Sequence, residues 1–183
     1  MPITLATVSL IWQPSTVTER HTTPSLPGRP CSVASGLALV GDKWSLLVVR
    51  ELMFGNHRFS QLVRNTGAPR DRLAARLTEL VEAGVVERVQ YTDRPPRYEY
   101  HLTASGRDLV PVINALRVWG DKWALEQPPA VFRHSCGHEL NGIAICRDCG
   151  EEIKTSTVDI EVRAPGWALS GPVDSAQAGT AKA

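Results

Sequence analysis

The sequence of 183 residues has no apolar run long enough to cross a membrane, since a spanning helix needs about eighteen or more such residues. The start, Met1–Trp12, is apolar but lacks the basic region and small-residue cleavage site of a secretory signal. We therefore expect a cytoplasmic protein that makes no contact with a membrane.

Motifs that carry catalysis are also missing. The chain has no glycine-rich phosphate loop, no paired carboxylates at helical spacing and no strained turn of the kind that exposes a nucleophilic serine. An enzyme using Cys31 with a histidine has no further support in the sequence. We expect that the protein is not an enzyme.

The formal net charge is only +1, but the charged residues are unevenly distributed along the chain. Between Arg58 and Arg76 there are five arginines and a single acid, Asp71. No lysine occurs in this stretch, and the guanidinium group is the cation that best matches both guanine edges and phosphates. A basic surface of this kind suits nucleic acid, although a solvated helix face is the plainer alternative.

The apolar spacing predicts four helices between residues 31 and 83. We expect them at 31–40, at 43–54 after an Asp42 cap, at a short segment starting at Phe59, and at 69–83. Gly67 suits the turn between the last two, because glycine adopts positive φ without strain. Pro69 suits the first helical turn, where its missing N–H costs nothing.

Two strands and a long helix follow. Residues 85–91 and 98–102 are rich in β-branched and aromatic residues, and Pro95-Pro96 stiffens the tip between them. Thr103 is a good cap for one long helix, Thr103–Glu126, that ends before Pro128. Its apolar stripe exceeds what a small domain can cover, so we expect two copies to pack these helices together as a homodimer.

This order of elements predicts a mainly α fold with a small β-hairpin, the winged helix-turn-helix. A helix fits the DNA major groove, and a basic hairpin can reach the neighbouring phosphates or minor groove. We expect double-stranded DNA as the partner. Base-reading candidates are Arg70, Arg72 and Arg76, without a choice among them, and the candidates for phosphate or minor-groove contact are Arg58, Ser60, Gln61, Arg94 and Arg97.

The chain resembles the HxlR-type family of bacterial transcriptional regulators over about 31–123. The matching residues of the first half are Cys31, Gly41-Asp42-Lys43-Trp44, Leu46-Leu47, Arg50-Glu51-Leu52, Gly55, Arg58-Phe59-Ser60, Leu62, Leu73, Arg76-Leu77 and Leu80. Those of the second half are Gly84-Val85-Val86-Glu87-Arg88, Pro95-Pro96-Arg97-Tyr98-Glu99-Tyr100, Leu102-Thr103, Gly106, Leu116 and Trp119-Gly120.

The resemblance implies a homodimeric, sequence-specific DNA-binding regulator that represses or activates nearby genes. One position departs from the family: Ala68 stands where many members place Ser or Thr before the proline. A lost cap costs about 1 kcal/mol, so the helix start is looser or a DNA phosphate substitutes. Cys31 corresponds to a redox or electrophile sensor in some members. Burial as a small packed residue is the alternative, and an effector is not identified.

A second group of residues predicts a metal site. Cys146 and Cys149 form a Cys-x-x-Cys-Gly knuckle, and Cys136-Gly137 fits the second position of another. A histidine must supply the fourth ligand, either His138 or His134, and we choose His138. Cys136, His138, Cys146 and Cys149 then form a closed tetrahedral set, which predicts one structural Zn²⁺, unless the ribbon has lost its metal.

These observations divide the chain into four parts. We expect a mobile arm over 1–30, the winged-helix DNA-binding and dimerisation domain over 31–127, a zinc-ribbon-like module over 128–160, and a disordered tail over 161–183. The stiff linker Gln127-Pro128-Pro129 should separate the folding of the module from that of the domain. The alternative function is a protein-interaction module, in which the ribbon binds a partner and the winged helix only dimerises.

Overall fold

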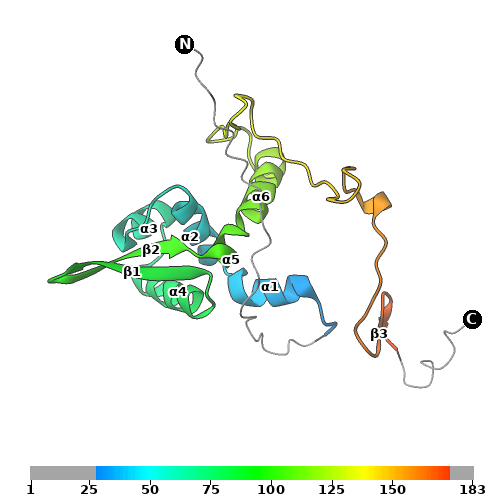
Figure 1. The fold of residues 1–183 in the computed structure, drawn as a ribbon, viewed down its shortest axis with the longest axis horizontal. Coiled ribbons are helices and arrows are strands. Elements are labelled where there is room, and N and C mark those ends of the chain that lie inside the picture. The colour runs from blue at the N-terminus through cyan, green and yellow to red at the C-terminus, as the bar shows by residue number, and fades with distance from the viewer. Residues whose placement is uncertain (1–27, 174–183) are drawn as a thin grey trace, which may run out of the picture.

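The structure, a computed structural model, describes residues 28–173. Almost all of the predicted N-terminal arm and the last part of the predicted tail lie outside the described residues. Figure 1 shows a body of helices with a projecting hairpin, one helix leading away from that body, and a C-terminal segment with little regular structure.

Six helices and one hairpin make up the folded part. In chain order they are α1 (Ser32–Val40), α2 (Lys43–Met53), α3 (Phe59–Thr66), α4 (Arg70–Glu82), β1 (Val86–Asp93), β2 (Pro96–Leu102), α5 (Ala104–Arg107) and α6 (Val110–Trp123). After α6 the described chain contains a single 3-10 turn, η1 (Thr155–Thr157), and a hairpin of two-residue strands, β3 (Trp167–Ala168) and β4 (Gly171–Pro172). That small hairpin lies in the segment predicted to be a disordered tail.

The core lies where α2, α3, α4 and the start of β1 meet. The predicted stripe of α4 is confirmed, since Leu73, Leu77 and Leu80 are all buried. They pack with the other buried side chains of the cluster, Val40, Val48, Val49, Leu52, Leu62, Ala68, Val85 and Val86. Because α4 buries one face so completely, its opposite face is left for solvent or a partner.

Three predicted helix ends are confirmed by their geometry. The Asp42 side chain accepts a hydrogen bond of 2.8 Å from the backbone N–H of Trp44 at the start of α2. Gly67 ends α3 with a φ of 68°, in the left-handed region that glycine tolerates. Thr103 caps α5 by accepting from the N–H of Gly106.

The prediction of one long helix over Thr103–Glu126 is wrong. The structure has two helices, α5 and α6, with a break at Asp108 and Leu109. Pro111 explains the break, because it has no N–H to donate to the carbonyl one turn back and its ring crowds that carbonyl. A smaller correction concerns Pro69, which is the N-cap residue of α4 and not part of its first turn.

Gly106 is fixed by a close backbone approach between α5 and the residue that precedes β1. A Cβ at this position would lie 2.2 Å from the carbonyl oxygen of Val85. The same region is tied by hydrogen bonds to the Gly84 carbonyl, of 2.6 Å from the Thr103 hydroxyl and 2.8 Å from the Ser105 hydroxyl. The junction between the hairpin and α5 is therefore rigid.

The first turn of the predicted C-terminal module contacts the rest of the fold. Arg117 of α6 donates a hydrogen bond of 2.7 Å to the carbonyl of Leu140, and its guanidinium lies 4.6 Å from the Phe132 ring centre. Phe132 also contacts Phe54 after α2, with ring centres 5.8 Å apart. Residues 132–140 are thus docked on the body, despite the proline-rich linker.

A helix that crosses a membrane has to be both long and apolar. Within 28–173, no single helix is long and apolar enough. The pair α1 and α2, bent by 77° between them, meets the requirement by length and composition only.

Candidate nucleic-acid interface

The outer face of α4 carries the arginines predicted to reach DNA. Arg70 and Arg72 are exposed in the first turn of the helix, on the side opposite the buried leucines. The Arg70 guanidinium lies 5.1 Å from the ring centre of Phe59, so it stacks on α3 while remaining accessible. Within 28–173, the Arg72 side chain makes no hydrogen bond or ion pair.

Arg76 differs from its neighbours. Its side chain is only 23% exposed, and its Nε lies 3.6 Å from a carboxylate oxygen of Asp42, the cap of α2. It also pairs with Glu79 one turn later in α4. Two carboxylates therefore hold the Arg76 guanidinium against the protein, where it links α4 to the start of α2.

The wing is the antiparallel hairpin of β1 and β2. Its register pairs Val86 with Leu102 at the base and Asp93 with Pro96 at the tip, with an irregularity between Gln90 and Thr92. The strands reach further toward the tip than predicted, because Pro96 pairs as the first residue of β2. In Figure 1 the hairpin extends well beyond the helices.

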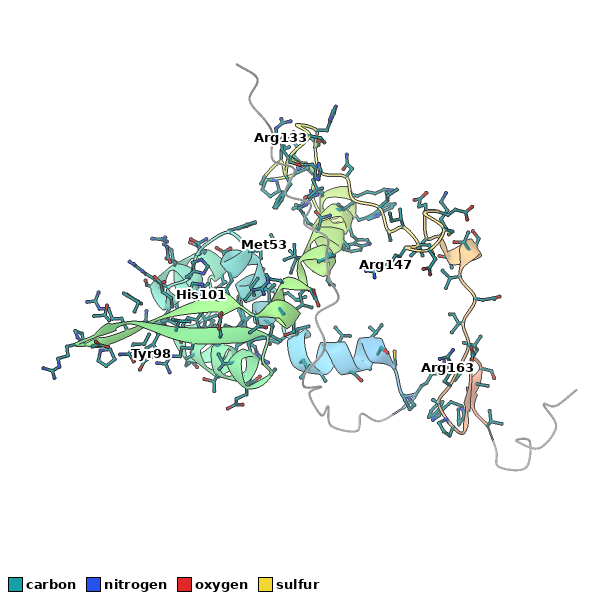
Figure 2. The ribbon with its side chains drawn as sticks, viewed as in Figure 1. Met53, Tyr98, His101, Arg133, Arg147 and Arg163 are labelled. Atoms are coloured by element: carbon teal, nitrogen blue, oxygen red, sulfur yellow. The ribbon has the colours of Figure 1, made fainter. Side chains whose placement is uncertain are left out.

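Two arginines at the hairpin tip are available to a partner. Arg94 and Arg97 are exposed, and neither side chain forms a hydrogen bond or ion pair with any residue that the structure describes. Arg88 lies further down the hairpin, with its guanidinium 3.5 Å from the ring centre of Tyr98. Tyr98 is marked on the hairpin in Figure 2. The free cations of the wing are thus concentrated at its tip.

The remaining predicted contacts lie at the start of α3. Arg58 pairs with Glu99 of β2 at 3.2 Å, and its guanidinium also lies 5.2 Å from the Tyr91 ring centre. The Gln61 side chain accepts a hydrogen bond of 2.9 Å from the backbone N–H of Arg58. Arg58 therefore links the start of α3 to the wing, and Gln61 caps α3 itself. Ser60 is exposed.

A buried carboxylate that the sequence reasoning missed holds the helix-turn-helix together. Glu51 is 4% exposed and accepts hydrogen bonds from Arg50, Asn56 and Asn65. The last of these, 2.9 Å long, ties α2 to the end of α3, just before the turn that leads to α4. The signal was available, because Glu51 falls between the buried positions Val48 and Leu52.

The turn before α4 contains the alanine that departs from the family pattern. Ala68 is buried, and its N–H donates a hydrogen bond of 3.2 Å to the hydroxyl of Thr66. The same hydroxyl donates to the Leu62 carbonyl at 2.7 Å. Pro69 supplies no side-chain cap to α4. The first N–H groups of α4 therefore remain open to an acceptor such as a phosphate.

Two histidines without a predicted role form a stacked pair at the base of the wing. The rings of His57 and His101 are 4.3 Å apart, and His57 Nδ1 lies 2.9 Å from the carbonyl oxygen of Tyr100. The backbone N–H of Tyr100 in turn donates to the His57 carbonyl at 2.9 Å. These contacts hold the loop before α3 against β2.

Cys31 is the N-cap residue of α1 and is exposed. Hydrogen bonds from the backbone N–H groups of Ala34 and Val33 lower the pKa of its thiol. The direction agrees with the expectation for a cysteine at a helix start. Its role as a sensor stays a prediction.

The predicted metal ligands lie on two separate turns. His134, Cys136 and His138 belong to the turn docked on α6, and Cys146 and Cys149 belong to the next one. In this arrangement no group of three or more His, Cys, Asp or Glu side chains in residues 28–173 is placed to hold a metal ion. Figure 2 shows Arg133 beside the first turn and Arg147 in the second, well apart.

The fold and the arginine-bearing face together define a winged helix-turn-helix DNA-binding protein. Residues 39–128 match the HxlR-like helix-turn-helix family. The chain belongs to this family of transcriptional regulators.

Relatives and solved structures agree with this assignment. The uncharacterised HTH-type transcriptional regulator Rv3095 of Mycobacterium tuberculosis is 47% identical over 133 residues, which cover 71% of this chain and 84% of the relative. The regulator sll1512 of Synechocystis is 41% identical over 101 residues, covering 55% and 74%. PA1607, a candidate transcription factor, has a TM-score of 0.62 and 32% identity, covering 72% of this chain and 94% of that one. PA1374 from Pseudomonas aeruginosa has a TM-score of 0.53 and 30% identity, covering 77% and 97%.

Proposed function

We propose that the protein acts in the cytoplasm as a homodimeric regulator that reads a specific operator in double-stranded DNA. The observation that carries this proposal is the division of charge on the DNA-binding elements. Among residues 28–173, the side chains of Arg72 on α4 and of Arg94 and Arg97 at the wing tip form no hydrogen bond or ion pair. Arg76 and Arg58, in contrast, form ion pairs within the fold.

The availability of these arginines indicates which part of the DNA α4 and the wing each contact. Arg72 on α4 is the best placed to reach base edges, with Arg70 beside it, because a helix in the major groove presents its outer face to the bases. Arg94 and Arg97 reach the flanking phosphates or minor groove from the tip of the wing. Arg76, Arg58 and Gln61 position these elements, and Ser60 remains a candidate phosphate contact.

The apolar faces of α1 and α6 support the dimer. On α6, Leu116, Trp119 and Trp123 are 51%, 59% and 66% exposed. On α1, Val33 and Leu37 are exposed as well. An apolar surface of this extent is rare on a monomer. A second copy of the chain can bury it by packing the same face against it in a twofold dimer, without any other partner. Two DNA-binding elements then face two half-sites.

The decisive experiment is a footprint of the purified protein on the DNA upstream of its own gene, together with a selection from random duplexes. We expect protection of a site with two related halves, spaced by about one helical turn or a multiple of it. A protein that binds all duplexes equally, or none, would contradict the proposal. Failure to bind DNA with retained dimerisation would favour the protein-interaction module instead.

A further inference from the structure

The two turns of the C-terminal segment are closed by the same two kinds of backbone hydrogen bond, although the first turn is one residue shorter than the second. In the first, the N–H of His134 donates to the His138 carbonyl and the N–H of Gly137 donates to the His134 carbonyl, both at 2.9 Å. In the second, the N–H of Cys146 donates to the Glu151 carbonyl and the N–H of Gly150 donates to the Cys146 carbonyl, both at 2.8 Å.

These hydrogen bonds show which residue of the first turn occupies the same position as each cysteine of the second turn. Each turn has a cysteine followed at once by a glycine with positive φ, 89° at Gly137 and 75° at Gly150. Cys136 therefore corresponds to Cys149, and His134 corresponds to Cys146. His138 corresponds to Glu151, which follows the second knuckle and is not one of its ligand positions. The hydrogen-bond register thus selects His134, whereas the sequence alone led to His138.

The side chains of each pair already face one another. His134 Nδ1 lies 3.2 Å from the sulfur of Cys136. In the second turn Cys146 and Cys149 are joined by a side-chain hydrogen bond, and the backbone N–H groups of Cys149 and Asp148 donate to the Cys146 sulfur. Backbone donors of this kind are the outer contacts that orient metal-bound thiolates.

We propose that His134, Cys136, Cys146 and Cys149 hold one structural Zn²⁺ in each chain. Three sulfurs and one imidazole nitrogen suit Zn²⁺ and leave no open position for water or substrate, so the site serves structure and not catalysis. Since the two turns lie apart in the structure, binding of the metal brings the second turn against the first.

The surroundings of the two turns fit such a closure. The first turn has a fixed position, because Arg117 and Phe54 hold its ends on the body. Beside the second turn, Ile143, Ile145 and Ile153 expose about half or more of their surfaces. Packing the second turn against the first would bury apolar surface of these isoleucines, which is exposed in the extended segment.

The test measures metal binding by the full-length chain purified without an affinity tag, so DNA binding does not enter it. We expect one zinc per chain by elemental analysis. We also expect Co²⁺ to give the absorption bands of a tetrahedral site with thiolate ligands. His134→Ala should weaken Zn²⁺ binding by more than the roughly 10- to 100-fold that loss of an outer contact costs.

His138→Ala is the matched control, and it should leave both zinc content and the cobalt spectrum unchanged. His134→Cys should keep the metal and raise the thiolate-to-cobalt absorption by about one third, because a fourth sulfur joins three. This gain identifies a ligand position, which a loss of folding cannot imitate.

Several results would overturn the proposal. A wild-type chain with no zinc would remove the site. Loss of metal in His138→Ala, with retention in His134→Ala, would reverse the ligand choice. One zinc for two chains would place the site between subunits, and retention in Cys146→Ser would exclude the second turn.

Discussion

Two arginines four residues apart on α4 have different surroundings, and we expect different effects from replacing them. Arg72 is exposed without a partner among the described residues, whereas Arg76 is held by Asp42 and Glu79. Arg72→Ala should weaken operator binding by about 1–3 kcal/mol, the worth of a good base contact. Arg76→Ala should weaken it less, through a looser α4. Gel-shift titrations measure both effects.

Arg163→Ala is the charge-matched control for these variants, since Arg163 lies in the C-terminal segment and pairs with Glu161. It should leave operator affinity unchanged. If Arg72→Ala binds the operator as tightly as the wild type does, α4 does not read bases through this residue.

Cys31 offers a second prediction for a single residue. Its thiolate is stabilised by backbone N–H donors, so its pKa is lower than that of an ordinary thiol. Iodoacetamide should therefore label Cys31 at lower pH than it labels a free thiol such as glutathione. Because folding lowers this pKa, the Cys31 thiolate stabilises the folded state at pH values above the unfolded-state pKa. This stabilisation is lost as the pH falls through the folded-state pKa. Mass spectrometry over a pH series gives the midpoint, and coincidence with glutathione would contradict the prediction.

Among the elements, the wing has the clearest separable role. Its tip carries Arg94 and Arg97, while Arg88 stacks on Tyr98 within the hairpin. Replacing both tip arginines with alanine should reduce the salt dependence of DNA binding by a slope of about two, since each phosphate contact contributes roughly 0.9. Arg88→Ala is the control on the same hairpin and should keep the wild-type slope. An unchanged slope in the double variant would place the tip away from the phosphates.

At the scale of the whole molecule, the prediction concerns the α6 face. Leu116→Glu together with Trp119→Glu should convert a dimer into monomers that bind a single half-site weakly, because two charges cannot be buried against a second copy. Light scattering at micromolar concentration measures the mass. Val158→Glu is the control, since Val158 is also exposed but lies in the C-terminal segment. A wild-type protein that is already monomeric would contradict the prediction.

The sequence determined the elements whose signals are local. Asp42, Gly67 and Thr103 act through hydrogen bonds or backbone angles within a few residues, so their positions alone predicted where the helices begin or end. The periodic leucines of α4 likewise predicted its buried face. The break between α5 and α6 also has a local cause, Pro111, although the apolar stripe alone predicted one continuous helix.

The tertiary structure decided which charged side chains are available. Arg72 and Arg76 are alike in the sequence, but only the fold brings Asp42 to Arg76 and leaves Arg72 exposed. It likewise decided that Glu51 is buried among donors from three segments, and that residues 132–140 dock on α6. Such outcomes depend on contacts between residues distant in the chain, and no local pattern encodes which partners a folded surface will supply.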